Sequence, residues 1–159
     1  MPNSERPNRI VYVDDDFEIR QLVRKAYEKG DPKHKIVMAT CGSGKEMLSR
    51  LNELQPNLIL LDLQMPEMSG PDTLDYLRAN KDGKDIPVIF MTGKTKIVMQ
   101  ESYKALGVLG IIYKPFDIDT LPDQILKIWE QRFGETNPNS DGRVLRELME
   151  DDSDSFSAD

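Results

Sequence analysis

Five short apolar runs, separated by stretches with helical periodicity, constrain the fold of this 159-residue chain more than any other feature. The runs are rich in β-branched residues and lie at Ile10–Val13, Ile36–Ala39, Leu58–Leu61, Val88–Met91 and Leu109–Tyr113. Such runs are typical of buried strands, and strands that alternate with helices form parallel βαβ units. We therefore expect an α/β fold within residues 9–133, a doubly wound, five-stranded parallel sheet with helices on both faces.

The stretches between the runs predict five helices. Three of them have clear apolar stripes at spacings of three and four residues, and these lie at Ile19–Tyr27, Met47–Leu54 and Ile118–Trp129. Two shorter helices are expected after Gly70 and after Gly93. Asp16 and Ser43 precede the first and second helices. Since short polar side chains accept hydrogen bonds from the free amides at a helix start, we expect both to be N-caps.

The net charge of −7 is concentrated near the C-terminus, because residues 134–159 contain eight acids and only two bases. This segment has little apolar surface to bury, so burial cannot offset the conformational entropy that the chain would lose on folding. We therefore expect an acidic, disordered tail. The alternative is a short helix near residues 142–150, docked on the domain or on a partner, since the apolar residues there share one helical face. Residues 1–8 are expected to form a flexible N-terminus.

The composition also excludes several classes of protein. With one cysteine (Cys41) and one histidine (His34), the chain can form neither an internal disulfide nor a zinc site built from four such ligands. No apolar run approaches the roughly 18 residues of a membrane span, and no signal-peptide pattern is present. We therefore expect a cytoplasmic protein without membrane association. The net acidity argues against direct binding to nucleic acid.

Acidic side chains follow two of the predicted strands. Asp14, Asp15 and Asp16 come directly after the first run, and Asp62 comes after the third. Because the carboxyl ends of parallel strands meet at one edge of the sheet, these carboxylates should lie close together. Two unit charges about 4 Å apart repel by roughly 4 kcal/mol at an effective dielectric constant of about 20. Such repulsion favours a lysine counter-ion or a divalent cation, and oxygen ligands beside a phosphate group favour Mg²⁺.

Two further strand ends add a hydroxyl and an ammonium group. Thr92 and Gly93 follow the fourth run, and Lys114 follows the fifth. The hydroxyl and the ammonium could both hold the oxygens of a phosphoryl group attached to a carboxylate. Asp62 suits the acceptor role because it ends a buried strand and precedes an open loop. Carboxylates are established nucleophiles that form aspartyl phosphates.

At these strand ends the chain resembles the receiver domain of two-component response regulators. The resemblance covers about 125 residues and rests on four motifs: Val-Asp-Asp-Asp at 13–16, Leu-Asp-Leu-Gln-Met-Pro-Glu-Met-Ser-Gly at 61–70, Met-Thr-Gly at 91–93 and Lys-Pro-Phe at 114–116. It implies the flavodoxin-like strand order 2-1-3-4-5, a part in a phosphorelay, and Mg²⁺ as the cofactor.

The resemblance also implies a role for each strand-end residue. Asp62 would accept a phosphoryl group from a phosphohistidine, and Thr92 and Lys114 would contact its oxygens, while Gly93 would keep the approach open. Asp15, Asp62 and the backbone carbonyl of Gln64 would bind Mg²⁺ directly. Asp14 would act on the ion through a water molecule.

Two features set this chain apart within the resemblance. Many receivers have an aromatic switch residue three positions before the strand-five lysine, where this chain has Ile111. Tyr113 lies two residues further on and should share its strand face. Gln64 and Lys94 occupy positions that influence the lifetime of the acyl phosphate in this family. A glutamine could position water and a lysine could not do so similarly, so we expect slow to moderate self-dephosphorylation.

We therefore expect a stand-alone receiver, a signalling module rather than a metabolic enzyme. It would receive its phosphoryl group from a histidine kinase or a histidine phosphotransfer protein and then change its affinity for a protein target. The expected switching surface combines the helix after Gly93, the fifth strand and the last helix; whether it also forms a homodimer is left open. The alternatives are a flavodoxin-like redox carrier, a hydrolase with an aspartyl nucleophile, and an adaptor that needs no phosphate.

Overall fold

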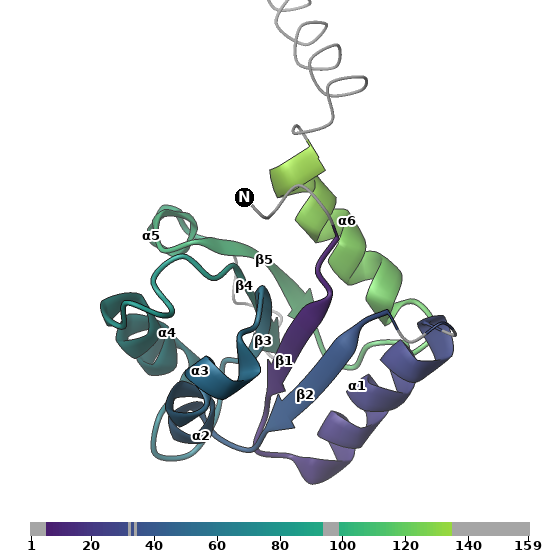
Figure 1. Ribbon diagram of the computed structural model, residues 1–159, viewed down its shortest axis with the longest axis horizontal. Coiled ribbons are helices and arrows are strands. Elements are labelled where there is room, and N and C mark those ends of the chain that lie inside the picture. Colours follow the sequence, from purple (N-terminus) through teal and green to yellow (C-terminus); the bar gives the residue numbers. More distant parts are fainter. Residues whose placement is uncertain (1–5, 32, 34, 94–98, 135–159) are drawn as a thin grey trace, which may run out of the picture.

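A single five-stranded parallel sheet organises the chain. The computed structural model describes residues 6–31, 33, 35–93 and 99–134, so Lys94 and the predicted tail helix lie outside the described residues. The sheet has the order β2-β1-β3-β4-β5, and every neighbouring pair is parallel (Figure 1). The strands are β1 (Arg9–Val13), β2 (Val37–Cys41), β3 (Leu58–Asp62), β4 (Val88–Thr92) and β5 (Val108–Tyr113). The predicted fold class and strand order are confirmed.

Helices cover both faces of this sheet (Figure 1). They are α1 (Phe17–Gly30), α2 (Gly44–Ser49), α3 (Leu51–Leu54), α4 (Gly70–Ala79), α5 (Glu101–Ala105) and α6 (Leu121–Phe133). Successive strand residues point to opposite faces, which produces two separate cores. Tyr12 and Leu60 pack with α1 and α6, whereas Val13 and Leu61 pack with the helices of the other face.

The central strands are buried on both sides. All five residues of β3 and all five residues of β4 are buried, as expected for parallel strands covered by helices on both faces. The edge strands are less protected, so the Val37 side chain of β2 is 52% exposed and the Tyr113 side chain of β5 is 38% exposed. The final residues of β3 and β4 therefore lie at the carboxyl edge of the sheet, in a well-packed environment.

Both predicted N-caps are confirmed. The Asp16 carboxylate accepts hydrogen bonds from the amides of Glu18 and Ile19 at the start of α1. The Ser43 hydroxyl accepts one from the amide of Glu46 in the first turn of α2. Each cap satisfies backbone donors that have no partner within the helix.

The predicted second helix is two helices, which corrects the single helix expected over Met47–Leu54. The interruption falls at Arg50, whose backbone (φ −112°, ψ 13°) leaves the helical region. Its amide donates to the carbonyl of Met47, three residues back, instead of continuing the four-residue ladder. The described residues thus contain six helices, and the predicted fourth and fifth helices correspond to α5 and α6.

The last helix begins three residues later than predicted. The carbonyl of Asp117 accepts hydrogen bonds from the amides of Thr120 and Leu121, which forms a turn before α6. Pro122 then occupies the first turn of the helix, where its missing amide has no partner to lose. Ile118 lies outside the helix but still packs against the α1–α6 core. Among the described residues, no helix is long and apolar enough to cross a membrane.

Candidate functional site

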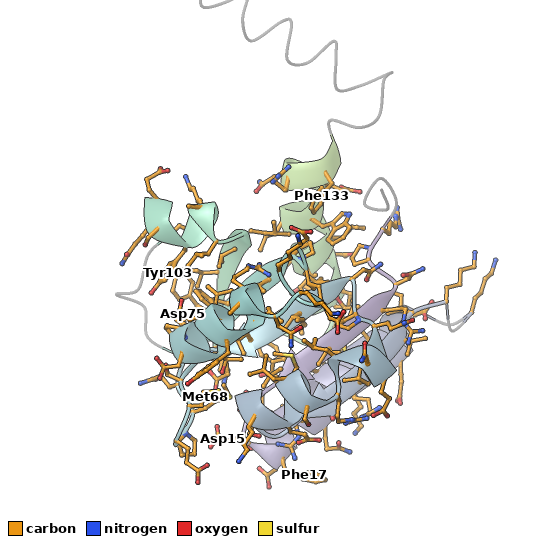
Figure 2. All side chains as sticks on the ribbon, turned by 60° about the vertical axis from the view of Figure 1, so that its left-hand side comes forward. Asp15, Phe17, Met68, Asp75, Tyr103 and Phe133 are labelled. Carbon is orange, nitrogen blue, oxygen red and sulfur yellow. The ribbon has the colours of Figure 1, made fainter. Side chains whose placement is uncertain are left out.

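Three carboxylates from two strand ends meet at the carboxyl edge of the sheet. One oxygen from each of Asp14, Asp15 and Asp62 lies within 4.8 Å of the others. Asp14 and Asp62 are buried, with exposed fractions of 1% and 4%, while Asp15 faces solvent. In Figure 2, Asp15 lies toward the lower end of the molecule and Phe133 toward the upper end. The predicted gathering of acids at one edge is therefore present for Asp14, Asp15 and Asp62, whereas Asp16 is the N-cap of α1.

Lys114 supplies the positive charge within this acid cluster. Its Nζ lies 2.8 Å from Asp14 Oδ2 and 3.3 Å from Asp62 Oδ1, so one ammonium bridges two buried carboxylates. The backbone places it there, because the Lys114 amide donates to the carbonyl of Thr92 on the neighbouring strand, at 2.7 Å. The bridge partly neutralises charges that would otherwise repel in a poorly solvated site.

Burial and charge shift the pKa values of this cluster. Burial, followed by the neighbouring charge of Asp14, raises the pKa of Asp62 from 3.8 to about 6, against the opposing effect of Lys114. Burial alone would lower the pKa of Lys114. The hydrogen bonds and charges of Asp14 and Asp62 outweigh that effect, so the pKa of Lys114 is raised. The lysine therefore remains protonated at neutral pH, when Asp62 is ionised.

Tyr12 contacts this site from the core side of the sheet. It was not identified from the sequence as a site residue. Its hydroxyl donates a hydrogen bond to Asp14 Oδ2, and its ring is buried in the α1–α6 core. Burial, and then the hydrogen bond to Asp14, raise the pKa of Tyr12, so the hydroxyl stays a donor. The available signal was the spacing, since residues two apart on a strand share a face. The sequence alone suggested only an apolar core position.

Backbone and guanidinium donors hold Asp14 from the other side. The Asp16 amide donates to Asp14 Oδ1 at 2.9 Å, and Arg20 Nη1 donates to the Asp14 carbonyl oxygen at 2.6 Å. Arg20 extends from α1, so the first helix is tied to the strand end that carries the acids. Arg20 was also not singled out in the sequence.

The end of β4 lies beside the acids. Thr92 is fully buried, and β4 is paired with both β3 and β5. Gly93 follows at the surface, where an added Cβ would meet no atom within 4 Å. Packing against the described residues therefore does not require glycine at this position, although the resemblance gives it the role of keeping the approach open.

The loop after Asp62 is fastened directly to the strand end. The Gln64 amide approaches Asp62 Oδ1 at 3.5 Å, and the Gln64 side chain is exposed. At the start of α4, the Gly70 amide donates to the carbonyl of Leu63. A Cβ at Gly70 would lie 2.5 Å from the carbonyl oxygen of Asp62 and 2.8 Å from the Cα of Leu63. Such close approach to backbone atoms requires glycine at this helix start.

Ile111 and Tyr113 lie on the same side of β5, as predicted. Ile111 is half-buried and packs with the core on the α2–α5 face, while Tyr113 is exposed at the end of the strand. A partner protein could therefore contact the Tyr113 ring more readily than the half-buried Ile111 side chain. Their predicted contribution to switching stays a prediction.

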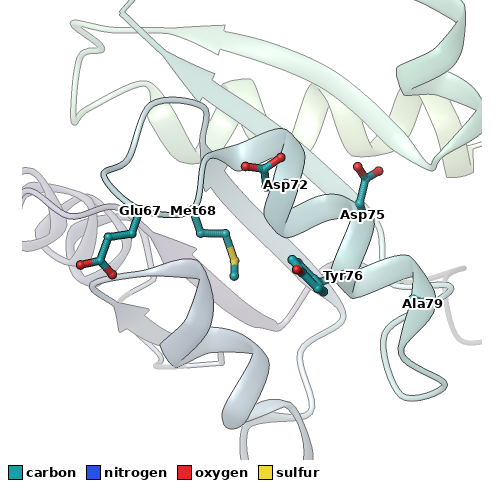
Figure 3. A pocket seen from close by; sticks show the side chains of 6 residues that line it. All are labelled: Glu67, Met68, Asp72, Asp75, Tyr76 and Ala79. Carbon is teal, nitrogen blue, oxygen red and sulfur yellow. The ribbon is translucent and has the colours of Figure 1, made fainter.

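A pocket of about 560 Å³ lies between the loop after Asp62 and α4 (Figure 3). Its lining combines three carboxylates with apolar and aromatic groups, from Glu67, Met68, Asp72, Asp75, Tyr76 and Ala79. The Tyr76 ring is 60% exposed. Since the acid cluster is not part of this lining, the pocket is a separate surface on α4 and its preceding loop.

The donor set of the acid cluster fits a hard divalent cation. Asp14, Asp15 and Asp62 offer only oxygen atoms, and no histidine or cysteine belongs to the cluster. Small hard cations such as Mg²⁺ prefer carboxylate, carbonyl and water oxygens. The exposed Asp15 leaves a side of the cluster open to solvent, from which an ion could enter with part of its water shell.

The raised pKa of Asp62 predicts a pH-dependent stability effect. The folded protein binds the proton on the Asp62 carboxyl group more tightly than the unfolded protein does. The contribution of this protonation to the free energy of unfolding is therefore fully present below about pH 4, and it is lost as the pH rises through about 6. Asp62→Asn removes this group. In EDTA, the stability of the variant relative to wild type should therefore grow by about 2 kcal/mol between pH 4 and pH 7. Urea unfolding at both pH values measures the difference.

A matched control for this measurement is Asp72→Asn, which removes an exposed carboxylate on α4. Its stability relative to wild type should change little over the same pH range. A pH-independent difference for Asp62→Asn would contradict the raised pKa.

Comparison with known proteins agrees with this geometry. The response regulator receiver domain family matches residues 10–126. Sporulation initiation phosphotransferase F of Bacillus subtilis is 32% identical over 119 residues, which cover 75% of this chain and 91% of that protein. The DNA-binding response regulator MtrA of Mycolicibacterium paratuberculosis is 33% identical over 108 residues, 68% of this chain and 45% of that protein.

A solved structure shows the same arrangement of elements. The chemotaxis response regulator CheY4 of Vibrio cholerae superimposes with a TM-score of 0.64 at 26% identity, covering 76% of this chain and 98% of that one. Receiver domains are signalling modules of two-component systems, in which phosphorylation and Mg²⁺ are typical. The chain belongs to the response regulator receiver domain family.

Proposed function

We propose that this receiver accepts a phosphoryl group on Asp62 and transmits the change to a protein partner. The observation that carries the proposal is the shared ammonium, with Lys114 Nζ at 2.8 Å from Asp14 and 3.3 Å from Asp62. A carboxylate held beside an ammonium group, in a cluster whose oxygen atoms could also hold a divalent cation, is suited to receive a group that brings additional negative charge. The buried Thr92 hydroxyl group on the adjacent strand adds a further polar contact for the phosphoryl oxygens.

In the proposed reaction, an Asp62 oxygen attacks the phosphorus of a phosphohistidine. The new O–P bond forms while the P–N bond breaks, and the bonding electron pair leaves with the imidazole nitrogen, which then takes up a proton. With acetyl phosphate the P–O bond breaks and acetate leaves. Lys114 would turn from Asp62 to an oxygen of the arriving group and hold its charge, while Thr92 would orient it.

Mg²⁺ would be held by Asp15, Asp62 and the backbone carbonyl of Gln64, with Asp14 acting through water. When bound, it would supply electrostatic stabilisation for the charge that develops during transfer. The oxygen-only donor set and the open side at Asp15 support this assignment. Gln64, Lys94, Ile111 and Tyr113 would influence the lifetime of the phosphorylated state or its readout.

The proposed partners follow from the family. The phosphoryl donor would be a histidine kinase or a histidine phosphotransfer protein, and the output would be contact with a protein target through α5, β5 and α6. The extensive match to sporulation initiation phosphotransferase F supports a relay role. In this proposal the receiver domain spans residues 9–133 and is followed by the acidic segment 134–159. Phosphorylation would act by shifting populations between two existing conformations.

Incubation with Mg²⁺ and acetyl phosphate tests this function. We expect wild-type protein to gain the mass of one phosphoryl group, and we expect excess EDTA to prevent the gain. Treatment with hydroxylamine should remove the group, because acyl phosphates react with this nucleophile and phosphate esters do not. The proposal would be wrong if the protein stayed unmodified both by acetyl phosphate and by a panel of phosphorylated histidine phosphotransfer proteins.

A further inference from the structure

The hydroxyl of Tyr12 reaches the acid cluster from inside the core. Tyr12 is fully buried on β1, and its ring packs with α1 and α6, so its position is set by the surrounding core. Two residues along the same strand face, Asp14 Oδ2 accepts the hydrogen bond from this hydroxyl. The donor therefore belongs to the core and the acceptor to the site.

Protein donors contact both oxygens of Asp14. Oδ2 accepts from the Tyr12 hydroxyl and from Lys114 Nζ, while Oδ1 accepts from the Asp16 amide. Lys114 also contacts Asp62, so its ammonium would shift when a phosphoryl group arrives there, and the hydrogen bond to Asp14 would shift with it. The Tyr12 and Asp16 bonds would remain, because a core side chain and a backbone amide supply them.

We propose that Tyr12 is a positioning residue, which holds the Asp14 carboxylate in place so that Asp14 can help to bind Mg²⁺ instead of turning fully toward Lys114. This inference rests on the proposed function and deepens it. A carboxylate with 1% exposure cannot recover a lost donor from solvent. Without the hydroxyl, Asp14 could rotate toward Lys114, its remaining side-chain donor, and away from the ion.

Tyr12→Phe tests the inference, because it removes only the hydroxyl. Loss of a hydrogen bond that orients a metal-binding group typically weakens metal affinity by roughly 10–100-fold, so we expect about a tenfold increase in the Mg²⁺ dissociation constant measured by calorimetry. The Mg²⁺ concentration for half-maximal phosphorylation by acetyl phosphate should rise equally. The rate at saturating Mg²⁺ should stay near that of wild type.

Tyr27→Phe is the matched control. Tyr27 lies on α1 in the same buried core and is 5% exposed. Its substitution by phenylalanine likewise removes only a hydroxyl group. Its Mg²⁺ affinity should equal that of wild type. The carboxyl carbon signal of Asp14 in NMR spectra should move in Tyr12→Phe and stay unchanged in Tyr27→Phe.

The outcomes separate this inference from the proposed function. If wild type binds Mg²⁺ and becomes phosphorylated while Tyr12→Phe has unchanged affinity, Tyr12 has no positioning role and the proposed function stands. Equal weakening in both tyrosine variants would also overturn the inference, because it would reflect a loosened core. If wild type neither binds Mg²⁺ nor accepts phosphate, the proposed function itself fails.

Discussion

Asp62→Asn should reduce phosphorylation by acetyl phosphate and Mg²⁺ from stoichiometric to background. Asparagine keeps the size of the side chain and an oxygen that can accept from Lys114, so the fold should be retained. Its amide is not a nucleophile, and no acyl phosphate can form. Intact-protein mass spectrometry after a timed incubation measures the loss directly, and the same samples can be examined for hydroxylamine-sensitive label.

Two companion variants make this result specific. Asp14→Asn changes the other buried acid of the cluster and should slow the modification without abolishing it, since the proposed acceptor is intact. Asp72→Asn, on the exposed side of α4, should be modified like wild type. Full modification of Asp62→Asn, or complete loss only in Asp14→Asn, would move the acceptor to another carboxylate.

Lys114→Ala should lower the free energy of unfolding in Mg²⁺-free buffer at pH 7 by about 3 kcal/mol, because removing one partner of a buried ion pair leaves the other charges uncompensated. Asp14 and Asp62 would then face each other without the ammonium that lies between them. Mg²⁺ should stabilise this variant more than wild type, because it would replace the missing positive charge. Thermal unfolding with and without Mg²⁺ measures both effects.

Phosphate-dependent signalling should fail in Lys114→Ala even where Mg²⁺ binding persists. Lys29→Ala provides the control, since Lys29 pairs with Asp119 at 2.6 Å on the open surface, with side chains 67% and 58% exposed. That pair is surrounded by water, and its removal should leave stability within error of wild type. Equal effects of the two lysine variants would mean that the bridge between Asp14 and Asp62 has no special importance.

Much of the fold was predictable because its elements have strong, simple periods. The apolar runs and the helical stripes identified five strands and the two-sided covering of the sheet, and Asp16 and Ser43 marked helix starts by their short acceptors. The break at Arg50 was not predictable, because the apolar stripe continues through it and only the backbone angles change. The late start of α6 depends on the turn at Asp117, which the stripe of Ile118 concealed.

The candidate site was predictable to a different extent. Topology alone brings the ends of neighbouring parallel strands together, so the meeting of Asp14, Asp62 and Lys114 followed from their positions along the chain. The sharing of one ammonium between two carboxylates did not follow, since it depends on ångström-scale distances. Tyr12 was hidden because a buried aromatic residue on a strand satisfies the apolar pattern whether or not its hydroxyl has a partner.

The contact at Gly70 has a mechanical consequence. A helix ordinarily rests on a strand end through side chains, which can rotate and absorb small displacements. Here the first turn of α4 abuts the peptide group of Asp62 with no methyl group between them. A displacement of that peptide group would therefore reach the start of α4 directly, and through α4 the surface that carries Tyr76 and Asp75.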